Sequence, residues 1–141
     1  MYTVGRVVLK DEVEAFKWYR KAAEQGQADA QMLLANIYVE GIGVLENYKE
    51  AVKWYTKAAQ KGHIEAQYTL GLMYVKGEGV EKNEREGYAW LLLSNYVKKD
   101  KQITKELTAI KKELDVKTIN AGQQRAARLL RRIKANTRGK K

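Results

Sequence analysis

The sequence predicts an all-α protein, a right-handed α-solenoid of antiparallel helix pairs that ends in a C-terminal helical cap. The first observation is an internal repeat: residues 11–46 match residues 47–82 at 17 of 36 positions. A period of about 20 to 50 residues is typical of stacked solenoids. The second observation is the helical spacing of the apolar residues inside each copy. The third is the complete absence of proline, the residue that breaks a helix interior.

Two apolar stripes in each copy predict two helices per unit. The first stripe runs through WYRKAAEQG, which returns as WYTKAAQKG, at the spacing i, i+3, i+4, i+7 and i+8. The second stripe follows at i, i+4 and i+8, and both spacings place the side chains on one face of a helix. The stripe residues are Ala15, Trp18, Tyr19, Ala22 and Ala23, then Ala30, Leu34 and Tyr38, each repeated 36 residues later. Because such stripes must be buried, we interpret the tryptophans as packing residues.

Glycine and asparagine mark the ends of these helices. Gly26 and its copy Gly62 follow the WYRKAA and WYTKAA helices, and the segments GIGV and GEGV follow the other two. Glycine adopts the left-handed conformation that ends a helix without steric cost. Asn47 and Asn83 are expected to N-cap the helices that follow them. The predicted helices cover about 11–25, 28–40, 47–61, 64–76, 83–97, 101–114 and 116–135.

The repeat decays after Trp90, and the last two helices predict a cap. A solenoid needs an atypical last unit, because a regular unit would expose the face meant for a neighbour. Asp115 is expected to N-cap the final helix. The apolar positions are Ile103, Leu107, Ile110 and Leu114 in one helix, and Val116, Ile119, Ala126, Leu130 and Ile133 in the other. We therefore divide the chain into repeats at 1–97, capping helices at 98–135 and a basic, flexible tail at 136–141.

The chain opens in the last part of a repeat. Tyr2, Gly5 and Val8 lie 36 positions before their copies in the next unit. The helix at 11–25 therefore lacks the partner that should precede it, and we expect its stripe to be less covered than the copy at 47–61. Either upstream repeats or self-association through this truncated unit would cover the stripe.

Composition excludes several classes of function. The net charge of +10 belongs to the C-terminal part: residues 1–94 hold 12 Lys/Arg and 13 Asp/Glu, whereas residues 95–141 hold 15 and 4. Cysteine is absent, which excludes disulfides and a thiol nucleophile. The sequence has no apolar run long enough to span a membrane and no secretory signal. We expect a cytoplasmic protein, or an exported one if the N-terminus is truncated.

Catalytic groups do not converge in this sequence. His63 is the sole histidine and Ser94 the sole serine. His63 directly follows a helix-ending glycine, so we interpret it as a solvated loop residue rather than a general base. Glu14, Glu50 and Glu86 repeat with the unit and are interpreted as solvated or helix-capping charges. The sequence predicts no enzyme, no cofactor and no metal site.

The segments AQMLLANIY and AQYTLGLMY, followed by GIGV or GEGV and then by EAVKWYTKAAQKG, closely resemble the Sel-one-like repeat, a relative of the tetratricopeptide repeat. The resemblance covers residues 2 to about 97. It implies that the AQ helices are the first helices of each pair and line the concave side of a superhelix. It also implies a scaffold or adaptor that binds a peptide or helix of another protein in that groove. The implied groove residues are Asp29, Met32, Asn36, Val39 and Glu40 in the first copy, and Glu65, Tyr68, Leu72, Val75 and Lys76 in the second.

The basic last helix provides a second hypothesis. Its cationic side would be formed by Arg125, Arg128, Arg131 and Arg132. A cationic amphipathic helix can bind nucleic acid or another anionic surface. The same charges also complement the helix dipole near a C-terminus, and the strip lacks interleaved aromatic residues for base stacking.

Overall fold

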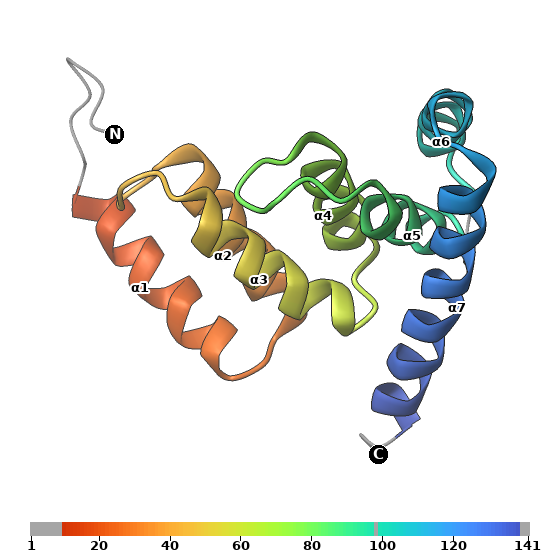
Figure 1. Cartoon of the computed structure of the whole chain (residues 1–141). Coiled ribbons are helices and arrows are strands. Elements are labelled where there is room, and N and C mark those ends of the chain that lie inside the picture. Colours follow the sequence, from red (N-terminus) through yellow and green to blue (C-terminus); the bar gives the residue numbers. More distant parts are fainter. Residues whose placement is uncertain (1–9, 98, 139–141) are drawn as a thin grey trace.

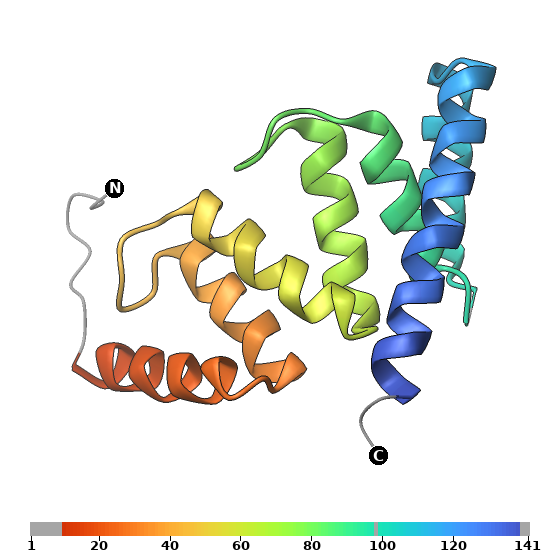
Figure 2. The same cartoon turned by 60° about the horizontal axis from the view of Figure 1, so that its bottom comes forward.

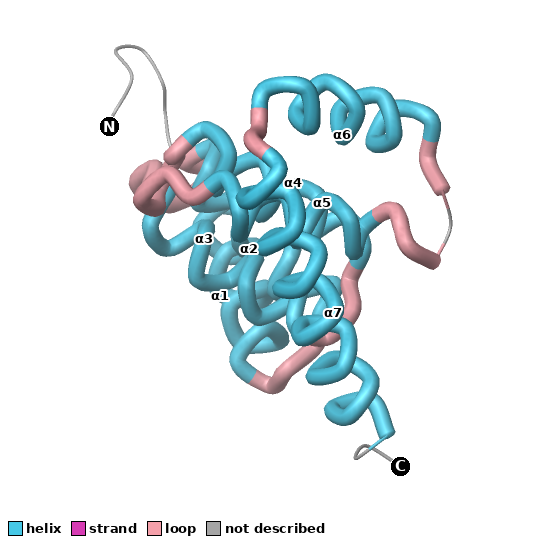
Figure 3. Tube along the Cα trace, turned by 45° about the vertical axis from the view of Figure 1, so that its right-hand side comes forward, coloured by secondary structure: helices cyan, strands magenta, loops and turns pink. Residues whose placement is uncertain are grey.

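The computed structural model describes residues 10–97 and 99–138, and these residues form seven α-helices and no strand (Figures 1 and 3). The helices are α1 (Lys10–Glu24), α2 (Ala28–Glu40), α3 (Tyr48–Gln60), α4 (Ile64–Lys76), α5 (Glu84–Ser94), α6 (Lys101–Glu113) and α7 (Val116–Arg138). The predicted all-α solenoid is confirmed, and most helix ends lie within one or two residues of the predicted ones.

The helices pack in the order in which they follow one another along the chain. Each of α1 to α4 packs against the next helix, so that α2 with α3 and α4 with α5 form the two complete pairs. Figure 1 shows this progression from α1 at one end to α7 at the other. In each pair, α2 or α4 is the first helix and α3 or α5 the second, whereas α1 is a second helix with no first helix before it among the described residues.

The predicted helix ends depend on local backbone chemistry. Asn47 Oδ1 accepts a hydrogen bond of 3.1 Å from the backbone N–H of Glu50, and Asn83 caps α5 in the same way. Both N-cap predictions are therefore confirmed. At Gly79 the backbone has φ +71°, and an added Cβ would lie 2.5 Å from the carbonyl oxygen of Tyr48. The GEGV loop thus needs glycine both for its left-handed conformation and for its close approach to α3.

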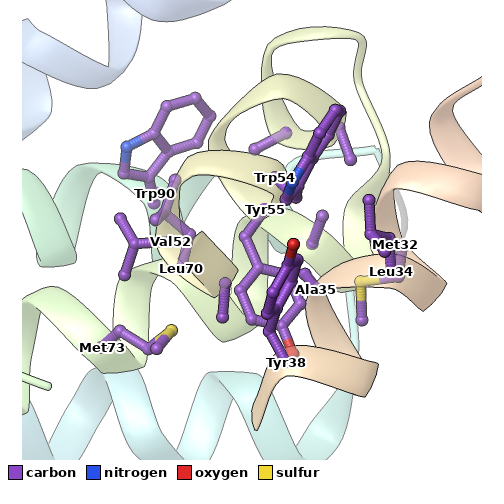
Figure 4. Close-up of a cluster of buried hydrophobic side chains, with 14 of the residues drawn as sticks. Met32, Leu34, Ala35, Tyr38, Val52, Trp54, Tyr55, Leu70, Met73 and Trp90 are labelled. Atoms are coloured by element: carbon purple, nitrogen blue, oxygen red, sulfur yellow. The ribbon is translucent and has the colours of Figure 1, made fainter. Parts of the chain in front are cut away.

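The repeated aromatic and alanine positions form the core. Leu34 and Leu70, which are equivalent residues of α2 and α4, are completely buried. Figure 4 shows Trp54, Tyr55 and Trp90, which belong to the second helices, in one buried cluster with Leu34 and Leu70. The tryptophans of the two complete pairs are therefore packing residues, as predicted.

A buried glutamine joins each first helix to the second helix before it. Gln31 Nε2 donates a hydrogen bond of 3.1 Å to the carbonyl oxygen of Ala23. Gln67 Nε2 donates an equal bond to the carbonyl oxygen of Ala59. Since a buried amide needs a partner, this pairing explains why the repeated segments begin with Ala-Gln.

The cap is fastened by α7, which lies along α5 (Figure 2). Ala126 and Leu129 of α7 are buried in the core cluster. Gly122 lies against Tyr88, where an added Cβ would come within 2.7 Å of the ring. Asp115 Oδ1 accepts a hydrogen bond of 2.7 Å from the backbone N–H of Thr118, so the predicted N-cap of α7 is confirmed.

Three details of the cap differ from the sequence prediction. Helix α5 ends at Ser94 and not at 97, because the side chain of Asn95 accepts a hydrogen bond from the backbone N–H of Asp100 and turns the chain. Val116, predicted to be part of the apolar side of α7, is 72% exposed because it lies in the first turn, whereas Leu129 is buried instead. Helix α7 also continues to Arg138, into the predicted flexible tail, since neither glycine nor proline interrupts residues 123–138.

The face of α1 that precedes the repeats is open. Trp18 is 71% exposed, whereas its copies Trp54 and Trp90 are 6% and 2% exposed. Tyr19 is also exposed, although Phe16 packs edge-on against Tyr38 with ring centroids 5.6 Å apart. The expected loss of cover on the first stripe is confirmed among the described residues. Tyr2, Gly5 and Val8 lie outside the described residues.

Candidate protein-binding surface

A narrow stripe of exposed side chains runs along each first helix. On α2, exposed Leu33 lies between Asp29 and Asn36 at helical spacing, and Glu40 follows one turn later. Residues at i, i+4, i+7 and i+11 share one helix face. The same four positions of α4 carry Glu65, Thr69, Leu72 and Lys76, of which the middle two are half-buried. The first-helix surface, as we call it, consists of Asp29, Leu33, Asn36, Glu40, Glu65, Thr69, Leu72 and Lys76.

Met32, which was predicted to face the groove, is buried instead. Its side chain is 6% exposed and belongs to the core cluster, whereas its neighbour Leu33 is 42% exposed. Helix α2 packs against both α1 and α3, so only a narrow arc of it remains open. Met32 and Val39 lie on the flank of that arc, and Val39 is accordingly half-buried against the core. Sequence reasoning missed Leu33 because its copy is Thr69 and the position has no apolar pattern.

Tyr68 and Val75 occupy the same flank of α4 and are half-buried. The Tyr68 hydroxyl donates a hydrogen bond of 2.7 Å to Glu106 Oε1 of α6. Burial, reinforced by this hydrogen bond, raises the pKa of Tyr68 to about 12. The predicted groove residue is therefore engaged within the chain, and its partner places α6 beside α4.

Two other polar residues of the first-helix surface also have partners within the chain. The Tyr55 hydroxyl donates to Asn36 Oδ1. Asp29 Oδ1 lies 3.0 Å from His63 Nε2, while His63 Nδ1 accepts a hydrogen bond from the backbone N–H of Ala66. His63 is thus the N-cap of α4 and a bridge to α2, which corrects its interpretation as a solvated loop residue. The physical reason is that the ring spans the joint between two units.

One arginine of the predicted cationic side of α7 is paired with a carboxylate within the chain. Arg125 donates hydrogen bonds of 2.8 Å and 3.2 Å to the two carboxylate oxygens of Glu86 on α5. This pairing raises the pKa of the Arg125 guanidinium. Arg125 therefore ties α7 to α5 and is not an open anion contact. Glu86, which was predicted to be a solvated or helix-capping charge, is 12% exposed and is the partner of Arg125. Arg128, Arg131 and Arg132 are exposed.

The side chains considered for catalysis have structural partners. Ser94 is completely buried, and its hydroxyl donates a hydrogen bond of 2.7 Å to the carbonyl oxygen of Leu91. Among residues 10–97 and 99–138, no group of three or more histidine, aspartate or glutamate side chains could hold a metal ion. No helix in the described part of the chain is long and apolar enough to cross a membrane.

Paired helices at a 36-residue period, joined by glycine loops and closed by a helical cap, define a helical-repeat solenoid. The Sel1 repeat model matches the chain at residues 1–27, 28–63 and 64–95. The chain therefore belongs to the Sel1 repeat family, whose members are generally scaffolds for protein interaction. Among curated proteins, a search finds no match.

Solved structures share the fold. A protective antigen of uropathogenic Escherichia coli with an SLR fold superposes with a TM-score of 0.81 at 28% identity, covering 92% of this chain and 28% of its own. A Sel1 repeat protein from Oxalobacter formigenes gives 0.65 at 38% identity, covering 69% of this chain and 40% of its own. The cysteine-rich protein B of Helicobacter pylori gives 0.61 at 23% identity, over 65% and 68%. This chain thus spans less than half the length of the first two.

Proposed function

We propose that the chain is an adaptor that binds a peptide or helix of another protein along the first-helix surface. The exposed fraction of Leu33, 42%, is the observation that carries the proposal. An apolar side chain held open on a rigid helix, beside equally spaced polar groups, is the arrangement that receives an amphipathic segment.

The charges of this surface indicate the chemistry of the segment. Asp29 and Glu40 flank Leu33 on α2, and Glu65 begins the corresponding stripe on α4, where Lys76 is the single cation of the surface. An excess of carboxylates attracts basic partners and repels acidic ones. We therefore propose a segment that combines an apolar anchor with lysine or arginine.

A pull-down with the tagged full chain from the native cell tests this proposal. Leu33→Asp and Leu72→Asp should each remove the partner that the wild-type chain retains. Val116→Asp is the matched control, because Val116 is apolar and 72% exposed but lies on α7. Retention of the partner by both surface variants, or equal loss in all three, would contradict binding at this surface.

A second candidate is anion binding through α7, supported by the exposure of Arg128, Arg131 and Arg132. Binding of a single-stranded oligonucleotide should then weaken steeply with salt, because each phosphate contact releases a counterion. It should be lost when the three arginines become glutamine. An oligonucleotide that binds the wild type and the triple variant equally would refute this candidate.

A further inference from the structure

A cavity of about 740 Å³ opens between α1, α3 and the C-terminal end of α7. None of the residues of the first-helix surface lines it, so it is a separate feature of the molecule. Its volume lies in the range of about 300–1,000 Å³ that is typical of ligand pockets. The residues that define it are Arg20 and Glu24 of α1, Trp54 and Lys57 of α3, Lys61, and Asn136 of α7.

In the next repeat, the equivalent space is occupied by side chains of the protein itself. In that repeat, Leu129 and Ile133 of α7 lie beside Trp90, which is the copy of Trp54. The cavity that remains there has a volume of about 240 Å³. Beside Trp54 only the tip of α7 reaches the space, through Ala135 and Asn136. The groove beside α5 is thus filled by α7, whereas the groove beside α3 is open.

The open cavity carries an excess of positive charge. Its lining holds four basic side chains and one acidic one, Glu24, which pairs with Arg20 at 3.2 Å. The Lys53 and Lys57 ammonium groups lie 5.5 Å and 5.8 Å from the centroid of the Trp54 ring. Among the described residues, no carboxylate lies within ion-pair distance of Lys57. A carboxylate entering the cavity would find this ammonium group available.

One wall of the cavity also has a hydrogen-bond acceptor without a donor. Gln31 is 3% exposed and lines the cavity, and its Nε2 is engaged with Ala23. Its Oε1 accepts no hydrogen bond from the described residues. An unsatisfied buried carbonyl costs free energy, which a ligand N–H that reaches this wall would recover.

We propose that this space, the Trp54 cavity, is a second binding site that receives an acidic peptide segment of a partner protein. A carboxylate of the segment pairs with Lys57, and backbone N–H groups of the segment face Gln31. A peptide fits better than nucleic acid, because Trp54 is 6% exposed and too buried to stack on a base. The site is independent of the first-helix surface.

A fluorescein-labelled peptide of sequence Glu-Asp-Leu-Glu-Glu, blocked at both ends, tests the proposal by fluorescence anisotropy with the full chain. Lys57→Glu should weaken its binding about tenfold or more, since a charge-assisted contact becomes a repulsion. Ala135→Trp should also weaken binding, because it fills the cavity from exposed α7 and leaves every charge in place. Arg128→Glu is the matched control, because Arg128 is exposed on α7 outside the cavity.

The outcomes separate the proposal from its rivals. Circular dichroism establishes that each variant is folded, and Lys57→Gln replaces Lys57→Glu if the latter is not. Equal binding by wild type and Ala135→Trp would overturn the proposal, as would the absence of binding by the wild type. Loss with Arg128→Glu but not with Lys57→Glu, or displacement of the peptide by an oligonucleotide, would move the site to the outer face of α7. Variants of Leu33 should leave this assay unchanged, so failure here and failure of the proposed function are distinguishable.

Discussion

The guanidinium of Arg125 holds both carboxylate oxygens of Glu86, at 2.8 Å and 3.2 Å, and thereby ties the cap helix α7 to the last repeat helix α5. Both side chains are largely buried, with exposed fractions of 26% and 12%. A paired charge in such surroundings is strongly oriented, and its partner is left desolvated if it is removed. The cap is therefore attached by a specific polar contact as well as by apolar packing.

Arg125→Ala should lower the free energy of unfolding by about 1–3 kcal/mol, because the Glu86 carboxylate would remain largely buried without its partner. Urea denaturation followed by circular dichroism measures this change. Arg128→Ala, on the same helix but exposed, should change stability by no more than about 0.5 kcal/mol. Equal effects of the two substitutions would show that the Arg125–Glu86 pair does not fasten the cap.

Gly79→Ala should destabilise the protein by about 2 kcal/mol or more. The left-handed backbone conformation is unfavourable for alanine, and the alanine Cβ would lie 2.5 Å from the carbonyl oxygen of Tyr48. Glu78→Ala, at the exposed neighbouring position, is the control and should be nearly neutral. Thermal unfolding of the two variants gives the comparison. A Gly79→Ala variant as stable as the control would contradict the close approach of the loop to α3.

Tyr68 should make stability depend on pH in the alkaline range. Its folded-state pKa is raised to about 12 from the ordinary tyrosine value of 10.0, so its contribution is full below about pH 10 and is lost as the pH rises through about 12. Tyr68→Phe removes that contribution. The stability difference between wild type and Tyr68→Phe should therefore shrink between about pH 8 and about pH 11 in urea unfolding experiments. A difference that stays constant would mean that Glu106 does not hold the protonated hydroxyl.

Gln67→Leu should cost about 1–2 kcal/mol of stability, because the carbonyl of Ala59 loses its buried donor. Gln124→Leu on α7 is the matched control, since Gln124 is exposed. Chemical denaturation of both variants measures the effect. If leucine at position 67 is as stable as glutamine, apolar packing alone joins successive units.

Trp18 should account for most of the tryptophan fluorescence that acrylamide can quench, because the other two indoles are buried. Trp18→Phe should remove the quenchable component and leave the rest. Quenching of the wild type at increasing dilution then tests self-association: a rise would show that a second copy covers α1 at high concentration. If Trp18→Phe leaves the quenching unchanged, α1 is covered by another part of the chain.

The repeat could be predicted from the sequence because its determinants are local and occur twice. The spacing of Trp54, Tyr55 and Ala58 specifies a buried helix face, and Asn47 with Gly62 specifies where the helix begins and ends. Each position has a copy that obeys the same geometry. Position 33 illustrates the opposite case, because Leu33 and Thr69 differ and neither reveals whether α1 and α3 leave that arc open.

The charges of α7 were harder to predict for the same reason. The sequence places Arg125 and Arg128 on one helix with similar surroundings, yet only Arg125 meets a carboxylate. That outcome depends on how α7 lies along α5, where Gly122 permits close approach to Tyr88. Through the same docking Leu129 is buried, whereas Val116, which was predicted to lie on the apolar side of the helix, is exposed.

By itself the sequence determined the helices, their ends, the pairing within each repeat and the membership of a repeat family, because these follow from short-range spacing and capping. Only the tertiary structure decided which side chains remain open: Leu33 rather than Met32, Arg128 rather than Arg125, and the Trp54 cavity rather than its filled copy at Trp90. The physical reason is that exposure depends on the angle at which helices distant in sequence cross. That angle is set by the sum of many contacts, and no single residue pattern encodes it.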